Sequence, residues 1–95
     1  MIVSFSDSET ELVWNGCFSK KIKLLSQLQE MARRKLRMLA AATTIETLRV
    51  PPGNRLETLR GDRTGQWSIR INEQWRICFK WEDGNASDVE ITDYH

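Results

Sequence analysis

Apolar side chains occupy every second position in two stretches of the second half of the chain, residues 66–71 and 75–81. A period of two is typical of strands that bury one face. The short link 72–74 predicts an antiparallel hairpin. The buried face would carry Trp67, Ile69, Ile71, Trp75, Ile77, Phe79 and Trp81. We interpret the tryptophans of this face as core residues, in preference to platforms that stack on bases.

The first half of the chain has a helical period instead. Between residues 19 and 42, apolar side chains recur at steps of three and four, and Arg33, Arg34 and Arg37 fall on the opposite face. Ser26 begins a helix-start pattern, so one helix and two helices with a break near Ser26 fit equally well. The apolar face would carry Leu25, Leu28, Ala32, Leu36 and Leu39.

Weaker signals predict the ends of the fold. Residues 2–5 are of strand type, and residues 87–93 predict a last strand. Ser6 and Glu9 fit a capping box, which predicts a short helix to about Trp14.

A rigid turn at residues 50–54 separates the helical half from the strand half, because two prolines there fix φ and remove two backbone donors. Residues 43–48 predict a single helical turn before it, and residues 55–60 a short strand after it. All these elements predict one α+β domain over residues 1–95. An N-terminal strand and amphipathic helices would pack on one face of a small antiparallel sheet.

Charge is distributed unevenly, although the formal net charge is +1. All 14 Lys and Arg lie within residues 20–80, together with five of the 13 Asp and Glu. A basic middle segment suits RNA, DNA or an acidic protein, but it also fits an ordinary solvated surface.

The sequence gives no indication of a membrane protein or of secretion. No apolar run approaches the roughly 20 residues of a membrane span, and the acidic start lacks the order of a signal peptide. We therefore expect a cytoplasmic protein. Cys17 and Cys78 lie far apart, so we expect two buried or half-buried free thiols, with neither a disulfide nor a metal site. Sequence motifs for nucleotide hydrolysis, zinc chemistry and serine hydrolysis are missing.

The polar face of the predicted sheet collects cations. Arginine presents a planar fork that suits phosphate oxygens, and the small residues Ser68, Cys78 and Thr92 would leave room for a ligand. Alternatively, the cations pair with Asp88 and Glu90 on the next strand, and spacing alone does not separate these interpretations. The cations are Arg70, Arg76 and Lys80, with Arg60 and Arg63 at the edge of the face.

The one tyrosine and the one histidine of the chain, Tyr94 and His95, are its last two residues. Histidine titrates near neutral pH and can move a proton. Tyrosine can do so where nearby arginines lower its pKa. Terminal residues are also often idle, so the pattern by itself leaves a catalytic and an inert role open.

At this level of detail the chain resembles the HigB branch of the RelE/ParE superfamily of bacterial toxins. The matching motifs cover nearly the whole length of the chain, and their order and spacing are specific to that family. It is carried by Met1-Ile2-x-Ser4-Phe5, Ala32-Arg33-Arg34-Lys35-Leu36, Pro51-Pro52-Gly53-Asn54-Arg55-Leu56, Leu59-x-Gly61-Asp62-Arg63-x-Gly65-Gln66-x-Ser68-Ile69-Arg70, Trp75-Arg76-Ile77-Cys78-Phe79 and Asp93-Tyr94-His95.

The resemblance implies a ribosome-dependent endoribonuclease that cuts mRNA without a metal or cofactor. It also implies a HigA antitoxin, a helix-turn-helix protein that binds operator DNA, so the toxin would meet that DNA only through the antitoxin. In the implied reaction the ribose 2′-hydroxyl attacks the adjacent phosphate and the 5′-oxygen leaves. This reaction needs a proton acceptor, a proton donor and positive charge on the transition state.

Roles for site residues follow from the same resemblance. Arg76 would hold the scissile phosphate, and Arg60 would assist it. Asp93 and His95 would share proton transfer and positioning, while Tyr94 would stack on a base or orient the nucleophile.

One position departs from the family pattern. Related toxins often carry a histidine in the strand before the Gly-Asp-Arg turn, and here that place is Glu57. A carboxylate can accept a proton but supplies no positive charge. Arg63, Arg70 and Lys80 remain candidates for contacts with RNA phosphates.

Toxins of the ParE type imply a different activity, the inhibition of gyrase by protein binding without catalysis. The terminal Asp93-Tyr94-His95 and Arg76 favour the nuclease, because a gyrase binder has no chemical need of them. Repression of the toxin's own operon together with the antitoxin is a third role, compatible with the first. The sequence does not indicate which surface binds the antitoxin.

Overall fold

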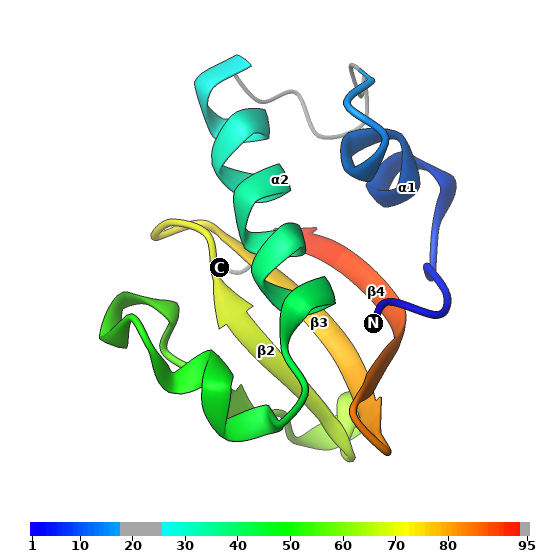
Figure 1. Cartoon of the computed structure of the whole chain (residues 1–95), viewed down its shortest axis with the longest axis vertical. Coiled ribbons are helices and arrows are strands. Elements are labelled where there is room, and N and C mark those ends of the chain that lie inside the picture. The colour runs from blue at the N-terminus through cyan, green and yellow to red at the C-terminus, as the bar shows by residue number, and fades with distance from the viewer. Residues whose placement is uncertain (18–25, 94–95) are drawn as a thin grey trace.

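The computed structural model describes residues 1–17 and 26–93 of the chain. Four antiparallel strands form one sheet in the order β1 (Glu57–Thr58), β2 (Gln66–Arg70), β3 (Trp75–Glu82) and β4 (Asn85–Asp93). Two helices, α1 (Ser8–Trp14) and α2 (Ser26–Ala41), lie on one face of this sheet (Figure 1). The predicted α+β architecture is confirmed.

The core lies between α2 and the sheet because both present the apolar faces that their periods predict. Ile69 of β2 is opposite Ile77 of β3, which is opposite Ile91 of β4. Leu36 and Leu39 of α2 pack on this layer and are fully buried. Each buried side chain of this size contributes about 1.5–3 kcal/mol relative to an exposed one. Trp67, Trp75 and Trp81 are partly buried against the same core, as predicted.

The N-terminal segment runs parallel to β4, although it forms two isolated bridges rather than a continuous strand. Ile2 pairs with Ala86 and Phe5 with Val89. The two bridges are three residues apart on both segments, and β4 contains a bulge between them, with Asp88 at φ 50° and a register shift against β3. The bulge explains why Ala86 and Val89 are both fully buried, which strict alternation does not allow.

The start of α1 corrects one prediction from the sequence. The N-cap is Asp7 rather than Ser6, and the Asp7 carboxylate accepts a hydrogen bond of 2.7 Å from the Thr10 amide. The end of the helix at Trp14 is as predicted. The buried Thr10 hydroxyl oxygen in turn accepts from the Ile91 amide at 2.9 Å, which attaches α1 to β4.

Helix α2 begins at Ser26, the position of the predicted break, and the part of the prediction that concerns residues 18–25 lies outside the described residues. After α2 come two 3-10 turns, η1 (Ile45–Arg49) and η2 (Pro52–Asn54). The predicted strand over residues 55–60 is shorter than expected, since β1 contains two residues. The segment that joins α2 to β2 lies at the edge of the sheet beside β2 (Figure 1).

A third 3-10 turn, η3 (Gly61–Arg63), precedes β2. Within residues 1–17 and 26–93, no helix is long and apolar enough to cross a membrane.

We expect the substitution Asp7→Ala to lower the free energy of unfolding by about 1 kcal/mol, because it removes the helix cap. The matched change Ser6→Ala removes the residue favoured by the sequence pattern and should cost no more than a few tenths of a kcal/mol. Urea unfolding followed by tryptophan fluorescence measures both. Equal losses for the two variants would contradict the assignment of Asp7 as the cap.

Candidate functional site

The face of the sheet opposite the helices carries the polar side chains that the strand alternation predicts. Residues opposite each other on neighbouring strands form rows across this face, and the register of the strands defines these rows. Glu57 of β1 is opposite Ser68 of β2, and Ser68 is opposite Cys78 of β3. In the adjacent row, Arg70 of β2 is opposite Arg76 of β3. Five candidate or neighbouring residues therefore meet on two adjacent rows.

Arg76 is the most buried cation of the site, with 7% of its surface exposed. Its Nε donates to Ser68 Oγ at 2.9 Å, and its Nη2 donates to the Arg55 carbonyl at 2.7 Å. A guanidinium taken out of water is costly unless its charge and donors find partners. These two bonds meet part of that need and restrict the orientation of the side chain.

The structure brings Glu57 to Arg76, two residues that are 19 positions apart in the sequence. The Glu57 carboxylate lies 3.8 Å from Arg76 Nη2, and the Glu57 side chain is 53% exposed. At this exposure the ion pair contributes little to stability. The accessible carboxylate is instead placed where a proton acceptor can act next to a fixed cation.

Arg70 and Arg76 are directly opposite each other, so two positive charges face one another across the strands. Like charges in such a pair repel. Within the part of the chain that the structure describes, Arg70 has no side-chain hydrogen bond or ion pair. An anion such as a phosphate would relieve the repulsion, which suits the predicted role of both residues.

Two other cations on this face are engaged with acids, as the alternative interpretation of the sequence predicted. Arg63 forms an ion pair of 2.9 Å with Glu90, and Lys80 one of 3.1 Å with Asp88. Their proposed contacts with RNA phosphates therefore compete with these pairs. Partly exposed pairs of this kind are worth about 0–1 kcal/mol, so a phosphate can displace them.

The expectation that small residues leave room for a ligand is wrong for two of the three. Ser68 and Cys78 are fully buried. Ser68 lies beneath the guanidinium to which it is bonded, and Cys78 lies among Arg63, Glu90 and Arg76. The surface that a ligand meets here is thus made by the long side chains rather than by the small ones.

Two of the remaining candidates, Arg60 and Asp93, are not brought into this cluster by the described structure. Arg60 is exposed and lies beyond β1, three residues from Glu57 in the direction away from Arg76. Asp93 ends β4 beside Trp75, and its carboxylate accepts from Gln74 at 3.2 Å. Tyr94 and His95 lie outside the described residues.

Sequence reasoning missed two partners of Arg76. The strand pattern indicates Ser68 only as a small residue that leaves room for a ligand. The hairpin register nevertheless places it one row from Arg76, and that signal is available in the sequence. The carbonyl of Arg55 carried no such signal, because a backbone acceptor is not visible in a pattern of side chains.

The two cysteines differ in environment. Cys78 is buried, and burial raises the pKa of its thiol; nearby Thr92 and Arg63 offset this only in part. Cys17 is exposed, which corrects the expectation that both thiols are at least half-buried.

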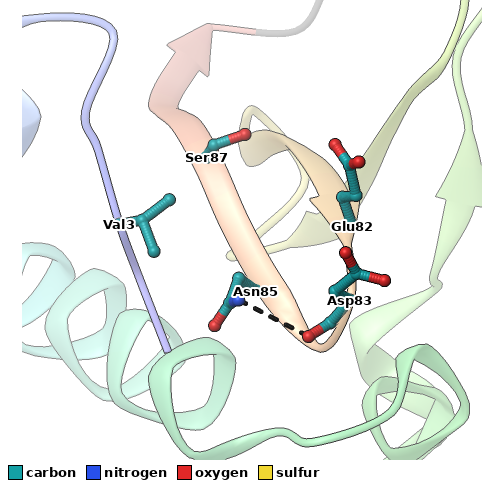
Figure 2. Close-up of a pocket in the computed structure, with 5 residues that line it drawn as sticks. All are labelled: Val3, Glu82, Asp83, Asn85 and Ser87. Carbon is teal, nitrogen blue, oxygen red and sulfur yellow. Dashed lines mark hydrogen bonds between the residues drawn. The ribbon is translucent and has the colours of Figure 1, made fainter.

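A separate pocket lies between the N-terminal segment and the turn that joins β3 to β4 (Figure 2). The pocket is lined by the apolar Val3 and by the acidic or polar residues Glu82, Asp83, Asn85 and Ser87. None of these is a candidate site residue. Among the described residues, no group of three or more His, Cys, Asp or Glu could hold a metal ion.

Comparison with known proteins gives a consistent result. A family model described as a RelE-like toxin of the type II toxin–antitoxin system HigB matches residues 5–95. Toxin HigB-1 of Vibrio cholerae is 40% identical over 92 residues, which are 96% of this chain and 95% of that protein. Endoribonuclease HigB of Proteus vulgaris is 44% identical over 41 residues, covering 43% of this chain and 45% of that protein.

Solved structures of low identity share the fold. The match to the YoeB–YefM complex from Staphylococcus aureus has a TM-score of 0.61 at 14% identity and covers 100% of this chain and 98% of the matched chain. The match to a mutant of YafQ from E. coli has a TM-score of 0.62 at 14% identity, with 98% of this chain and 91% of the matched chain covered.

We expect a thiol reagent to modify Cys17 rapidly in the folded protein and to leave Cys78 unmodified at pH 8, because the Cys78 thiol is buried and its raised pKa leaves little thiolate. Mass spectrometry after timed alkylation measures both sites. The variant Cys17→Ser serves as the control and should react only after urea is added. Rapid modification of folded Cys17→Ser would contradict the burial of Cys78.

Proposed function

The chain belongs to the HigB family of RelE-like toxins of type II toxin–antitoxin systems, and from this premise we propose that it is an endoribonuclease that cuts messenger RNA on the ribosome. A toxin of this family has an antitoxin as its partner, and we infer that the antitoxin of this chain is a helix-turn-helix protein of the HigA type. A relative that aligns over part of the chain is named Endoribonuclease HigB, which agrees with the proposed activity.

The observation that supports the proposal most directly is an arginine held by hydrogen bonds beside an accessible carboxylate. Arg76 is held by Ser68 and by the Arg55 carbonyl, and Glu57 lies 3.8 Å from it. Preorganised positive charge is worth most where it stabilises charge that develops in the transition state. Phosphate transfer to a ribose hydroxyl develops such charge on the phosphate oxygens.

The proposed reaction needs no group beyond the RNA and the side chains. The 2′-hydroxyl oxygen forms a bond to the adjacent phosphorus, and the bond from phosphorus to the 5′-oxygen breaks. The proton of the 2′-hydroxyl passes to an acceptor, a role that we assign to Glu57, and the departing 5′-oxygen gains a proton. We assign that donation and the positioning of the nucleophile to Asp93, Tyr94 and His95, following the family pattern.

The remaining cations extend the surface along which RNA would lie. Arg70 adds a second guanidinium beside Arg76, while Arg60, Arg63 and Lys80 would contact neighbouring phosphates. Binding through several phosphates should weaken as salt concentration rises, because counterions are released. In this proposal the protein acts in the cytoplasm, where ribosomes are, and reaches operator DNA through the antitoxin.

Primer extension on mRNA from cells that express the toxin tests the function. Discrete new 5′ ends inside a translated reading frame are expected, and they should vanish from a reporter whose start codon is removed. Intact mRNA together with gyrase-dependent DNA damage would instead establish the ParE-like activity and contradict the proposal.

We expect Arg76→Ala to lower the cleavage rate by about 10²- to 10³-fold, because it removes a cation from the transition state. Arg76→Lys keeps the charge but loses the planar fork, so it should recover part of the rate. Arg49→Ala is the control, since Arg49 pairs on the exposed surface with Glu46. Rates are measured on ribosomes stalled on one codon, after circular dichroism has verified the fold. Full activity of a folded Arg76→Ala variant would remove Arg76 from the mechanism.

Deletion of His95 should abolish translation arrest while the melting temperature stays within a few degrees of that of the full chain. The physical reason is the loss of the one side chain that titrates near neutral pH. His95→Gln keeps a hydrogen-bonding side chain without the acid–base function and should be as inactive as the deletion. Arrest by both variants at the full level would show that His95 takes no part in cleavage.

A further inference from the structure

Arg55 has a backbone conformation that L-residues avoid. Its φ of 45° and ψ of 57° lie in the left-handed region, directly after η2. A non-glycine residue stays in this region where its surroundings hold it there, and such residues concentrate at functional sites. In this conformation the Arg55 carbonyl points at Arg76 and accepts the bond of 2.7 Å.

The Arg55 side chain does not account for this conformation. It is exposed, and within residues 1–17 and 26–93 it has no hydrogen bond or ion pair. What the left-handed conformation provides is therefore the direction of the carbonyl. The amide of Arg55 closes the turn by donating to the Pro52 carbonyl at 3.1 Å, and the preceding Asn54 amide donates to Pro51 at 2.9 Å.

Asn54 locks this turn to the rest of the molecule. It is fully buried, and its amide group donates to the carbonyls of Leu48 at 3.2 Å and Val50 at 3.4 Å. Its side-chain oxygen accepts from Lys35 of α2. Burial lowers the pKa of Lys35, and the nearby positive charge of Arg34 lowers it further, because both disfavour the charged ammonium group. A buried amide satisfied on both its donor and acceptor sides has one orientation.

These contacts form one continuous connection from α2 to the candidate site. Lys35 holds Asn54, Asn54 holds the turn, and the turn presents the Arg55 carbonyl to the Arg76 guanidinium. We propose that Asn54 and Arg55 are positioning residues, which fix the orientation of Arg76 through a main-chain carbonyl held in a left-handed turn. The consequence for cleavage rests on the function proposed above, whereas the orientation of Arg76 does not.

Substitutions at Arg55 test the proposal, because they change the cost of the left-handed conformation while each removes the same charge. Asn tolerates this conformation, Ala tolerates it less, and the β-branched Val tolerates it least. The carbonyl should accordingly stay in place in Arg55→Asn and be displaced in Arg55→Val. Arg55→Ala, which is intermediate, provides the measurement if the Val variant does not fold.

The first readout is hydrogen exchange of the Arg76 Nε–H in ¹H–¹⁵N spectra, which does not depend on activity. In the native chain this proton is buried and bonded to Ser68 Oγ, so we expect it to exchange slowly. We expect exchange to accelerate by on the order of tenfold in Arg55→Val and to stay near the native rate in Arg55→Asn. The Nε–H of Arg33, which donates to the Trp14 carbonyl, is the internal control and should not change.

The second readout is cleavage on stalled ribosomes. The expected result for Arg55→Val is a kcat lower by roughly 10- to 100-fold with KM nearly unchanged, since misplacement of a catalytic group affects the transition state. Arg55→Asn should keep a kcat near that of the native chain. Unchanged exchange of the Arg76 proton in Arg55→Val would overturn the positioning role, whatever the cleavage rate. Accelerated exchange with unchanged cleavage would support the positioning role and overturn the part of Arg76 in the reaction.

Discussion

The burial of one positive charge organises the functional half of this molecule. Arg76 is the second residue of β3 and has little contact with water, and a charge in that position requires partners. They come from three separate segments: the hydroxyl of Ser68 on β2, the carboxylate of Glu57 on β1, and the backbone carbonyl of Arg55 after η2. The need to satisfy one guanidinium therefore brings together β1, the middle strands and the turn that follows α2.

This arrangement separates two kinds of cation on the same face. Arg76 is fixed, and it is suited to stabilising charge at one point in space. Arg70 and Arg60 are more accessible, and Arg63 and Lys80 form partly exposed ion pairs that a polyanion can displace. A toxin that must hold a flexible RNA and cleave one bond in it needs both kinds. Glu57 stands at the boundary between them, where it is accessible to solvent yet close to the fixed cation.

The helices support the site from the opposite face of the sheet (Figure 1). Helix α2 buries its apolar face against the sheet, and Lys35 on its side binds Asn54 in the turn that precedes β1. Helix α1 is attached to β4 through Thr10, and the N-terminal segment pairs with the same strand. Pairing along β4 covers a strand that would otherwise be an open edge of the sheet.

The sequence determined the parts of this structure that depend on local periodicity. The alternation in residues 66–71 and 75–81 placed the tryptophans on the core side and Arg70 and Arg76 on the other side, because a strand turns each successive side chain to the opposite face. The helical period assigned Ala32, Leu36 and Leu39 to the core in the same way. The resemblance of motifs in order and spacing pointed to the family that the comparisons show.

Tertiary structure alone decided the features that depend on contacts between distant segments. The bulge at Asp88 changes which residues of β4 are buried. Arg63 and Lys80 form ion pairs with acids because the fold brings them next to Glu90 and Asp88 of β4. The bond from Arg76 to the Arg55 carbonyl is of the same kind, since it joins residues 21 positions apart through a main-chain atom. Every residue carries a carbonyl, so its presence in the sequence says nothing about where it points. Only the folded turn, held by Asn54, gives that carbonyl its direction.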